Sequence, residues 1–254
     1  MRGLLDRWRL RGRRWETHLY YPAILDLVGR KALVVGAGKV GEGKIRGLLN
    51  GGATVKVVSL EATPQVQRWG KEGSIELELR RYEDADLEGC FVVIAATERT
   101  ETNEQVYAGA ERRNMLCNVV DVPRLCNFIL PSIMRRGDLA IAVSTAGASP
   151  ALARKIRLEL EDRYGEGYDV ALELLGSLRE ELKARYPDPR HRKILFERIV
   201  YSDFMDMVHT GETDKLEAWI DRCIEEGPDY APEHEHRAMI AAALASGDAT
   251  KDRV

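Results

Sequence analysis

Long apolar runs and C-x-x-C pairs of cysteines are both missing from this sequence of 254 residues. No run approaches the ~18 apolar residues that a membrane-spanning helix needs, so we expect no membrane contact. The four cysteines form no C-x-x-C pair, which predicts buried, reduced and structural thiols. The Arg-rich start has no apolar stretch behind it and is not expected to be a secretory signal. These absences favour a cytoplasmic protein.

The two ends of the chain differ in charge, but neither has the composition of a nucleic-acid-binding segment. Residues 1–20 hold six arginines against two acids, whereas the last part of the chain is acidic. Asp6 and Glu16 interrupt the basic start, which favours a solvated extension over a mitochondrial address. Because the formal net charge is −3, we expect no nucleic acid among the partners.

Apolar runs alternate with helical patterns through the first half of the chain. Strands are predicted over residues 31–35, 54–58, 75–79, 91–95 and 116–120, and helices over 39–50, 64–71 and 100–113. This alternation predicts the α/β class, with a doubly wound parallel sheet of the Rossmann type. In such a sheet the carboxyl ends of the strands share one edge, and ligands bind there.

The pattern changes after Asp121. Two short strands are predicted over residues 128–130 and 139–144, and the link between them is too short for a crossover helix. They are therefore expected to form an antiparallel pair outside the main sheet. Helices are predicted from Pro150 onward and over residues 170–186, 191–208 and 213–226. The Rossmann sheet is thus expected to be followed by a small α+β segment and a C-terminal helical domain.

A glycine-rich loop joins the first predicted strand to the first predicted helix. Its sequence, Gly36-Ala37-Gly38-Lys39-Val40-Gly41, is a complete G-x-G-x-x-G motif. In this motif the first glycine permits a tight turn, the second lets the backbone approach a pyrophosphate, and the third lets the helix pack closely on the strand. Amide groups at the helix N-terminus would bind the phosphates. The strand–loop–helix context predicts a dinucleotide site.

The second predicted strand lacks the acid that usually holds the cofactor ribose. Position 59 is Ser, so Ser59, the Leu60 backbone and Glu61 are three candidates for that contact. No arginine stands there to receive a 2′-phosphate, which favours NAD over NADP. Thr97, which follows the fourth predicted strand, is either a helix N-cap or part of the wall of the cofactor pocket.

Asp121 lies at the carboxyl end of the fifth predicted strand, where the nicotinamide of a bound dinucleotide is expected. Hydride transfer from carbon usually needs a base for the accompanying proton, and an aspartate can serve. The alternative is an aspartate that caps a turn before Pro123.

Basic residues cluster around a loop of small residues in the middle of the chain. The cluster comprises Arg124, Arg135, Arg136, Arg154, Lys155 and Arg157. The loop, from Ser144 to Pro150, is rich in hydroxyl groups and leads into a helix, an arrangement that suits anions. Arginine side chains around it would suit several carboxylates. The pattern favours a polyanionic substrate, and the alternative is a set of solvated helix faces.

Several of these motifs occur together, in an order found in a known family. They are Tyr20-Tyr21-Pro22, the glycine loop, Ala95-Ala96-Thr97, Asn118-Val119-Val120-Asp121, Phe128-Ile129-Leu130-Pro131-Ser132, and Ser144 to Pro150 followed by Ala153 and Arg157. Over about residues 20–226 the chain resembles the precorrin-2 dehydrogenase module of siroheme synthases. The resemblance implies an NAD-dependent oxidoreductase that converts precorrin-2, a polycarboxylate tetrapyrrole, to sirohydrochlorin.

The resemblance also implies roles for individual residues. Asp121 matches the family's key aspartate, the proposed general base. Together with the glycine motif, the expected cofactor contacts are Gly36, Gly38, Lys39, Val40, Gly41, Ser59, Leu60, Glu61 and Thr97. The expected substrate contacts are Asn118, Arg124, Ser144, Thr145, Gly147 and Arg154.

Members of this family are homodimers in which the two chains exchange their middle segments. The resemblance therefore implies a homodimer here. In some relatives the same site inserts Fe2+, and the sequence leaves ferrochelatase activity open. A regulatory module that senses NAD without catalysis is the competing interpretation, since the fold alone permits it. The expected segments are a basic N-terminal extension (1–19), an NAD-binding Rossmann domain (20–125), a dimerisation segment (126–166), a helical domain (167–227) and an acidic tail (228–254).

Overall fold

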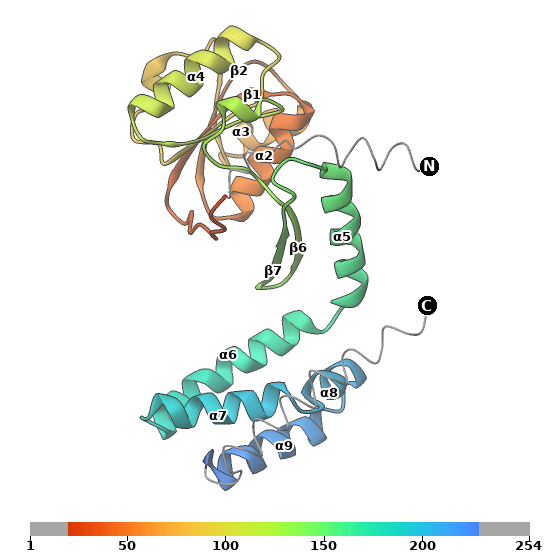
Figure 1. Ribbon diagram of the computed structural model, residues 1–254. Helices are drawn as coiled ribbons and strands as arrows, with labels where there is room; N and C mark the ends of the chain where they lie inside the picture. Colours follow the sequence, from red (N-terminus) through yellow and green to blue (C-terminus); the bar gives the residue numbers. More distant parts are fainter. Residues whose placement is uncertain (1–19, 229–254) are drawn as a thin grey trace, which may run out of the picture. The chain divides into compact units, whose positions relative to one another are not determined.

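The computed structural model describes residues 20–228, which divide into two compact units (Figure 1). The first unit contains the chain up to Leu130 together with Thr145–Ser149, and the second contains Pro131–Ser144 and the chain from Pro150 onward. The predicted basic extension and nearly all of the predicted acidic tail lie outside the described residues. No helix in the described range is long and apolar enough to cross a membrane.

Five parallel strands form the sheet of the first unit, in the order β3-β2-β1-β4-β5. The strands are β1 (Lys31–Ala37), β2 (Thr54–Ala62), β3 (Glu76–Leu79), β4 (Val92–Ala95) and β5 (Leu116–Val119). Between them lie α2 (Lys39–Asn50), α3 (Pro64–Lys71), the 3-10 helix η1 (Asp84–Leu87) and α4 (Thr100–Arg112). The strand order reverses direction at β1, which confirms the predicted doubly wound Rossmann fold.

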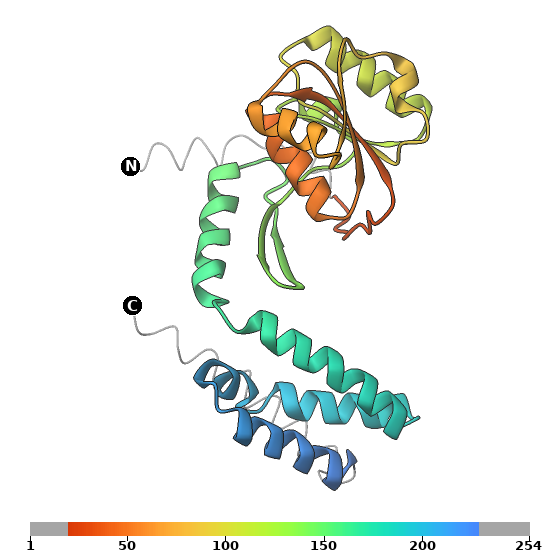
Figure 2. The same ribbon diagram turned by 180° about the vertical axis from the view of Figure 1, so that it is seen from behind.

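The sheet is covered on both faces, because successive side chains along a strand point to opposite sides. Ala32 and Val34 of β1 belong to a core that includes Ile45 of α2 and Val66 of α3. Leu33 of the same strand belongs to a second core, formed with η1 and α4. In Figure 2, α2 and α3 lie on one side of the sheet and α4 on the other. Burial on both faces explains why the strand sequences are almost continuously apolar.

β2 is longer than the sequence predicts. The predicted strand ends at Val58, whereas β2 continues to Ala62. Its pairing with β1 shifts on the way, because Val35 pairs with Val58 but Ala37 pairs with Ala62. The residues between, Ser59–Glu61, form a bulge opposite the first glycine of the loop. The sequence does not reveal this extension of β2, since its pairing depends on β1 and not on a local apolar pattern.

An antiparallel hairpin forms the middle of the chain, in the second unit. Its strands are β6 (Ser132–Arg136) and β7 (Leu139–Val143). The two-residue turn contains Gly137 at a φ of +53°, a conformation that glycine adopts without strain. The predicted antiparallel pair is confirmed, but the strand predicted over 128–130 is wrong. That segment belongs to the first unit, where the Phe128 side chain packs against the core.

Helices make up the rest of the second unit. They are α5 (Pro150–Arg163), α6 (Tyr168–Arg185), α7 (Pro189–Val200), α8 (Phe204–Thr210) and α9 (Thr213–Glu226). The core of α6 to α9 includes Leu182, Leu195, Ile199 and Phe204. The single helix predicted over residues 191–208 is wrong, because α7 and α8 are separate. Between them the Ser202 hydroxyl donates to the Ile199 carbonyl (2.8 Å) and accepts from Trp219 Nε1 (3.0 Å).

Candidate functional site

The glycine loop follows β1 as predicted, and its three glycines differ in the space around them. Gly36 has a φ of +102°, and a Cβ there would lie 2.4 Å from the Ala96 carbonyl oxygen. A Cβ on Gly41 would lie 2.1 Å from the Gly36 carbonyl oxygen. A Cβ on Gly38 would meet no atom of the described residues within 4 Å. The space beside Gly38 is therefore open to a pyrophosphate, so the loop fits a dinucleotide.

The start of α2 supports the same use of this loop. Gly38 is the N-cap residue, and no side chain in the described part of the chain caps the helix. The first backbone N–H groups of α2 therefore lack both an intrahelical acceptor and a capping oxygen. Lys39 and Val40 are exposed beside them. Such a helix start attracts a phosphate through its N–H groups and its partial positive charge.

The three candidates for the ribose contact lie on the bulge of β2 and differ in their surroundings. The Ser59 hydroxyl accepts a hydrogen bond from the Ala37 amide (3.1 Å) and donates to the Glu61 carbonyl (2.6 Å). Ser59 thus joins the ends of β1 and β2 and serves a structural purpose. Leu60 and Glu61 are exposed on the bulge, so they are the better placed of the three to meet a ribose.

Thr97 lies next to the glycine loop but does not cap α4. The N-cap of α4 is Arg99, whose amide donates to the Thr97 hydroxyl (3.2 Å). That hydroxyl donates in turn to Oδ1 of the buried Asn103 (2.8 Å). The methyl carbon of Thr97 lies 3.1 Å from the position that a Cβ on Gly36 would occupy. The N-cap interpretation is therefore wrong, and Thr97 forms part of the wall beside the loop.

Backbone hydrogen bonds join the carboxyl ends of three neighbouring strands. The Ala96 amide, after β4, donates to the Val35 carbonyl of β1 (2.8 Å). The Val120 amide, after β5, donates to the Ala95 carbonyl of β4 (2.9 Å). The glycine loop, Thr97 and Asp121 consequently lie along the same edge of one sheet, as the sequence predicts.

Asp121 occupies an unusual backbone conformation. Its φ is +60°, one of three positive values among the non-glycine residues described. It lies in a turn closed by a hydrogen bond from the Val122 amide to the Val119 carbonyl (3.2 Å), and the residue is exposed. Aspartate tolerates this left-handed region better than most residues, but the conformation still carries strain. Strain of this kind clusters at functional sites.

Two of the predicted substrate contacts lie close to Asp121 in the chain. Asn118 is buried, and its Nδ2 donates to the Phe128 carbonyl (3.0 Å), so its amide group stabilises the protein itself. Arg124 lies in the 3-10 helix η2 (Pro123–Leu125) and is exposed, with an ion pair to Glu104 (3.1 Å). Arg124 is thus better placed than Asn118 to contact a substrate.

The loop of small residues before α5 contains a tight turn. The Ala148 amide donates to the Thr145 carbonyl (2.9 Å), with φ of +50° at Ala146 and +84° at Gly147. Two successive positive φ values are typical of a type I′ turn. The Thr145 hydroxyl accepts from the Ser149 amide (3.0 Å), so it fixes the entry to α5. Ser144, which precedes the turn, is exposed and belongs to the second unit.

The predicted basic cluster is partly neutralised. Lys155 and Arg157 form ion pairs with Glu159 and Glu161 one turn further along α5. Arg136 donates to backbone carbonyls, including that of Glu161 (3.5 Å). Arg154 is exposed near the start of α5, and no ion pair involves it in the described part of the chain. Ion pairs thus engage Lys155 and Arg157, whereas the charge of the exposed Arg154 is available to a ligand.

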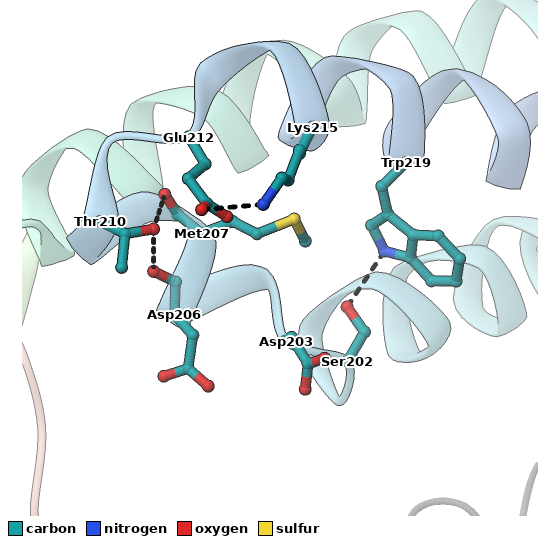
Figure 3. A pocket seen from close by; sticks show the side chains of 8 residues that line it. All are labelled: Ser202, Asp203, Asp206, Met207, Thr210, Glu212, Lys215 and Trp219. Carbon is teal, nitrogen blue, oxygen red and sulfur yellow. Dashed lines mark hydrogen bonds and ion pairs between the residues drawn. The ribbon is translucent and has the colours of Figure 1, made fainter.

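Figure 3 shows a pocket in the second unit, lined by residues of α8, α9 and the links that precede these two helices. Lys215 pairs with Glu212 (2.9 Å), and Trp219 donates to Ser202 (3.0 Å). The Thr210 hydroxyl donates to the Asp206 carbonyl of its own helix (2.9 Å). The pocket contains none of the residues predicted from the sequence, and its polar groups pair largely with one another.

Family models match three consecutive segments of the chain. Residues 23–132 match a family described as putative NAD(P)-binding. Residues 136–163 match the central segment of a sirohaem biosynthesis protein, and residues 168–224 match a sirohaem synthase dimerisation region. The first match indicates that the Rossmann unit binds a nicotinamide dinucleotide, and it does not distinguish NAD from NADP.

Curated relatives are similar to most of the chain. The siroheme synthase of Nitrosococcus oceani is 34% identical over 88% of this chain and 47% of its own length. That of Pseudomonas fluorescens is 37% identical over 84% of this chain and 46% of its own. The chain thus spans about half the length of the curated relatives that it matches.

One solved structure, named SirC, precorrin-2 dehydrogenase, is similar over its full length. It covers 80% of this chain, with 26% sequence identity and a TM-score of 0.69. The three family matches follow one another along the chain, from residue 23 to residue 224. Three consecutive segments of the chain thus match family models of NAD(P)-binding and sirohaem synthesis proteins, and the chain is similar to SirC, precorrin-2 dehydrogenase, over that structure's full length.

Proposed function

We propose that this chain is an NAD-dependent dehydrogenase that oxidises precorrin-2 to sirohydrochlorin in siroheme biosynthesis. The observation that carries the proposal is the shared sheet edge, where backbone bonds bring the glycine loop and the Asp121 turn together. The similarity to SirC, whose printed name is precorrin-2 dehydrogenase, supports the choice of substrate.

The glycine loop and the bulge of β2 would hold the cofactor. Backbone amides at Gly38, Lys39 and Val40 would bind the pyrophosphate, and Leu60 and Glu61 would meet the adenosine ribose. Bound NAD+ supplies the acceptor for a hydride. Because the Glu61 carboxylate is exposed on the bulge, it would accept a hydrogen bond from the ribose 2′-hydroxyl and repel a 2′-phosphate. We therefore propose NAD as the cofactor.

Asp121 would act as the general base. Oxidation of precorrin-2 removes a hydride and a proton, and the Asp121 carboxylate would accept the proton. Asp121 lies in the turn that the bond from the Val122 amide to the Val119 carbonyl closes, so its backbone is held before the substrate binds. Such prior positioning lowers the entropy cost of the reaction.

The remaining residues are proposed as substrate contacts of different kinds. Arg124 and Arg154 would each bind a carboxylate. Thr145 and Gly147 would shape the turn that presents backbone amides, and Ser144 would offer its hydroxyl. Asn118 would act indirectly, because its amide already holds the Phe128 carbonyl.

We further propose a homodimer and the segment boundaries derived from the sequence. The match of residues 168–224 to a dimerisation region supports self-association. Exposed apolar side chains on the second unit, Ile133, Leu152 and Leu158, would need a covering surface. The boundaries 20–125, 126–166 and 167–227 separate the dinucleotide domain from these two parts.

The test is an anaerobic assay with enzymatically generated precorrin-2 and NAD+ in which NADH is followed by its absorbance. The matched variant is Asp121→Asn, because asparagine keeps the shape and the left-handed backbone but cannot accept the proton. We expect NADH from the wild-type protein and a loss of about 10²-fold or more in the variant. NAD+ affinity, measured by titration calorimetry, should be equal in both.

The same assay distinguishes the competing functions. Addition of Fe2+ after NADH formation would reveal ferrochelatase activity as an enzyme-dependent change in the visible spectrum. NAD+ binding without any NADH would contradict the dehydrogenase and favour a sensing module. Comparison of NAD+ with NADP+ would test the role given to Glu61.

A further inference from the structure

The chain that follows the Asp121 turn runs back along the outer edge of β5. Cys126 forms an antiparallel bridge with Asn118. The Asn127 amide donates to the Cys117 carbonyl (3.1 Å), and Asn127 Oδ1 accepts from the Cys117 amide (2.8 Å). Asn127 Nδ2 donates to the Met115 carbonyl (2.7 Å). This return segment is therefore tied to the strand from which the turn departs.

The Cys126 sulfur lies at the base of the turn that carries Asp121. The Val119 amide donates to Sγ at 3.3 Å. The same sulfur lies 3.2 Å from the Val119 carbonyl oxygen and 3.4 Å from the Val122 carbonyl oxygen, either of which its S–H can reach. A single side chain thus contacts both residues that flank the two central positions of the turn.

The turn needs such support because Asp121 is a non-glycine residue at positive φ. A strained conformation persists only where the surrounding structure holds it. The backbone bond that closes the turn, from the Val122 amide to the Val119 carbonyl, is 3.2 Å long. The sulfur contacts the Val119 carbonyl that accepts this bond and, separately, the carbonyl of Val122. Burial also raises the pKa of the Cys126 thiol, although the Val119 amide opposes this, so the proton that it donates is retained.

We infer that Cys126 is a positioning residue for Asp121. Its thiol fixes the turn between Val119 and Val122 and thereby holds the Asp121 carboxylate in the place from which it accepts a proton. This inference rests on the proposed function for its catalytic consequence, whereas the support of the turn is independent of it.

The experiment compares Cys126→Ala and Cys126→Ser with Cys90→Ala in the full-length protein. Cys90 is a matched control, because it is also a half-buried thiol and contacts backbone carbonyls, at Asp86 (3.4 Å) and Glu88 (3.9 Å), away from the turn. Amide hydrogen exchange by NMR measures the stability of the turn in the absence of substrate. Steady-state kinetics measure the effect of each substitution on catalysis.

We expect the Val122 amide to exchange about tenfold faster in Cys126→Ala than in the wild type. In the same variant kcat for precorrin-2 oxidation should fall about tenfold, since small displacements of a catalytic group are costly. The KM for NAD+ should stay unchanged. Cys126→Ser should restore most of both losses because a hydroxyl also donates and accepts, and Cys90→Ala should show neither.

Two results would overturn the inference. Val122 exchange in Cys126→Ala equal to that in Cys90→Ala would show that the thiol does not hold the turn. Faster exchange with an unchanged kcat would show that the turn does not position a catalytic group. A wild-type protein without dehydrogenase activity would instead remove the proposed function, and with it the catalytic consequence, whatever the exchange data show.

Discussion

The sheet of the first unit and the hairpin of the second bury their strands to very different extents. Leu33 and Val34, neighbours on β1, are both fully buried because helices cover both faces of the parallel sheet. In β6 and β7 only Met134 is buried, and Ile133 beside it is exposed. The sheet thus completes its core within one chain, whereas the hairpin has an apolar surface that agrees with self-association.

The helical part of the second unit offers the sharpest way to test whether the two units are independent. Phe204 is fully buried among the residues of α6 to α9. Phe204→Ala should lower the free energy of unfolding by about 3–5 kcal/mol, because a large cavity remains. Urea unfolding followed by circular dichroism measures this loss, with Met205→Ala, at a half-buried neighbour, as the milder control. NAD+ affinity should not change, and a parallel loss of affinity would show that the units depend on each other.

A buried carboxylate in the first unit is expected to make a smaller contribution to the free energy of unfolding, and one that depends on pH. The Asp86 side chain is 3% exposed and forms ion pairs with Arg80 and Lys56. Burial alone would raise its pKa, but hydrogen bonds from Arg80, the Glu83 amide and Lys56 outweigh this and lower the pKa to about 2. An unfolded aspartate has a pKa of about 3.9, so the stabilisation is complete above that pH and is lost as the pH falls through about 2.

Asp86→Asn should therefore lower the free energy of unfolding on the order of 2 kcal/mol at pH 7. The difference from the wild type should shrink as the pH falls from about 4 to about 2. Urea titrations at several pH values measure it. The exposed Asp84, which pairs with Arg112 and Arg113, provides the control Asp84→Asn with a smaller loss. A difference that is constant with pH would contradict the assignment to the Asp86 carboxylate.

The smallest expected effect concerns the bulge of β2. Ser59→Ala removes the acceptor for the Ala37 amide and the donor to the Glu61 carbonyl. We expect a loss of about 1 kcal/mol in unfolding free energy, and a several-fold weaker affinity for NAD+ because Glu61 would lose its position. Titration calorimetry measures the affinity, and the exposed Ser74→Ala is the control. An unchanged affinity for NAD+ would show that the bulge does not position a group that contacts the cofactor.

The sequence predicts the first unit well, because its signals are local. The observed bounds of α2 and α3 equal the predicted ones, since glycines or a proline mark their ends. The place of Asp121 at the end of β5 follows from the strand pattern, but its positive φ does not. Three features depend on distant partners and are therefore hidden: the β2 bulge opposite Gly36, the return segment at Cys126, and the break before α8 that Trp219 fixes.

The return segment along β5 also bears on how the protein avoids aggregation. An open strand at the edge of a sheet can pair with the sheet of another molecule. At β5 the Asn127 side chain occupies the backbone groups that such a neighbour would need. At the opposite edge, β3 is only four residues long and carries Glu76 and Glu78. The two ends of the sheet are therefore closed to intermolecular strand addition by different means, a side chain that imitates backbone at one and charge on a short strand at the other.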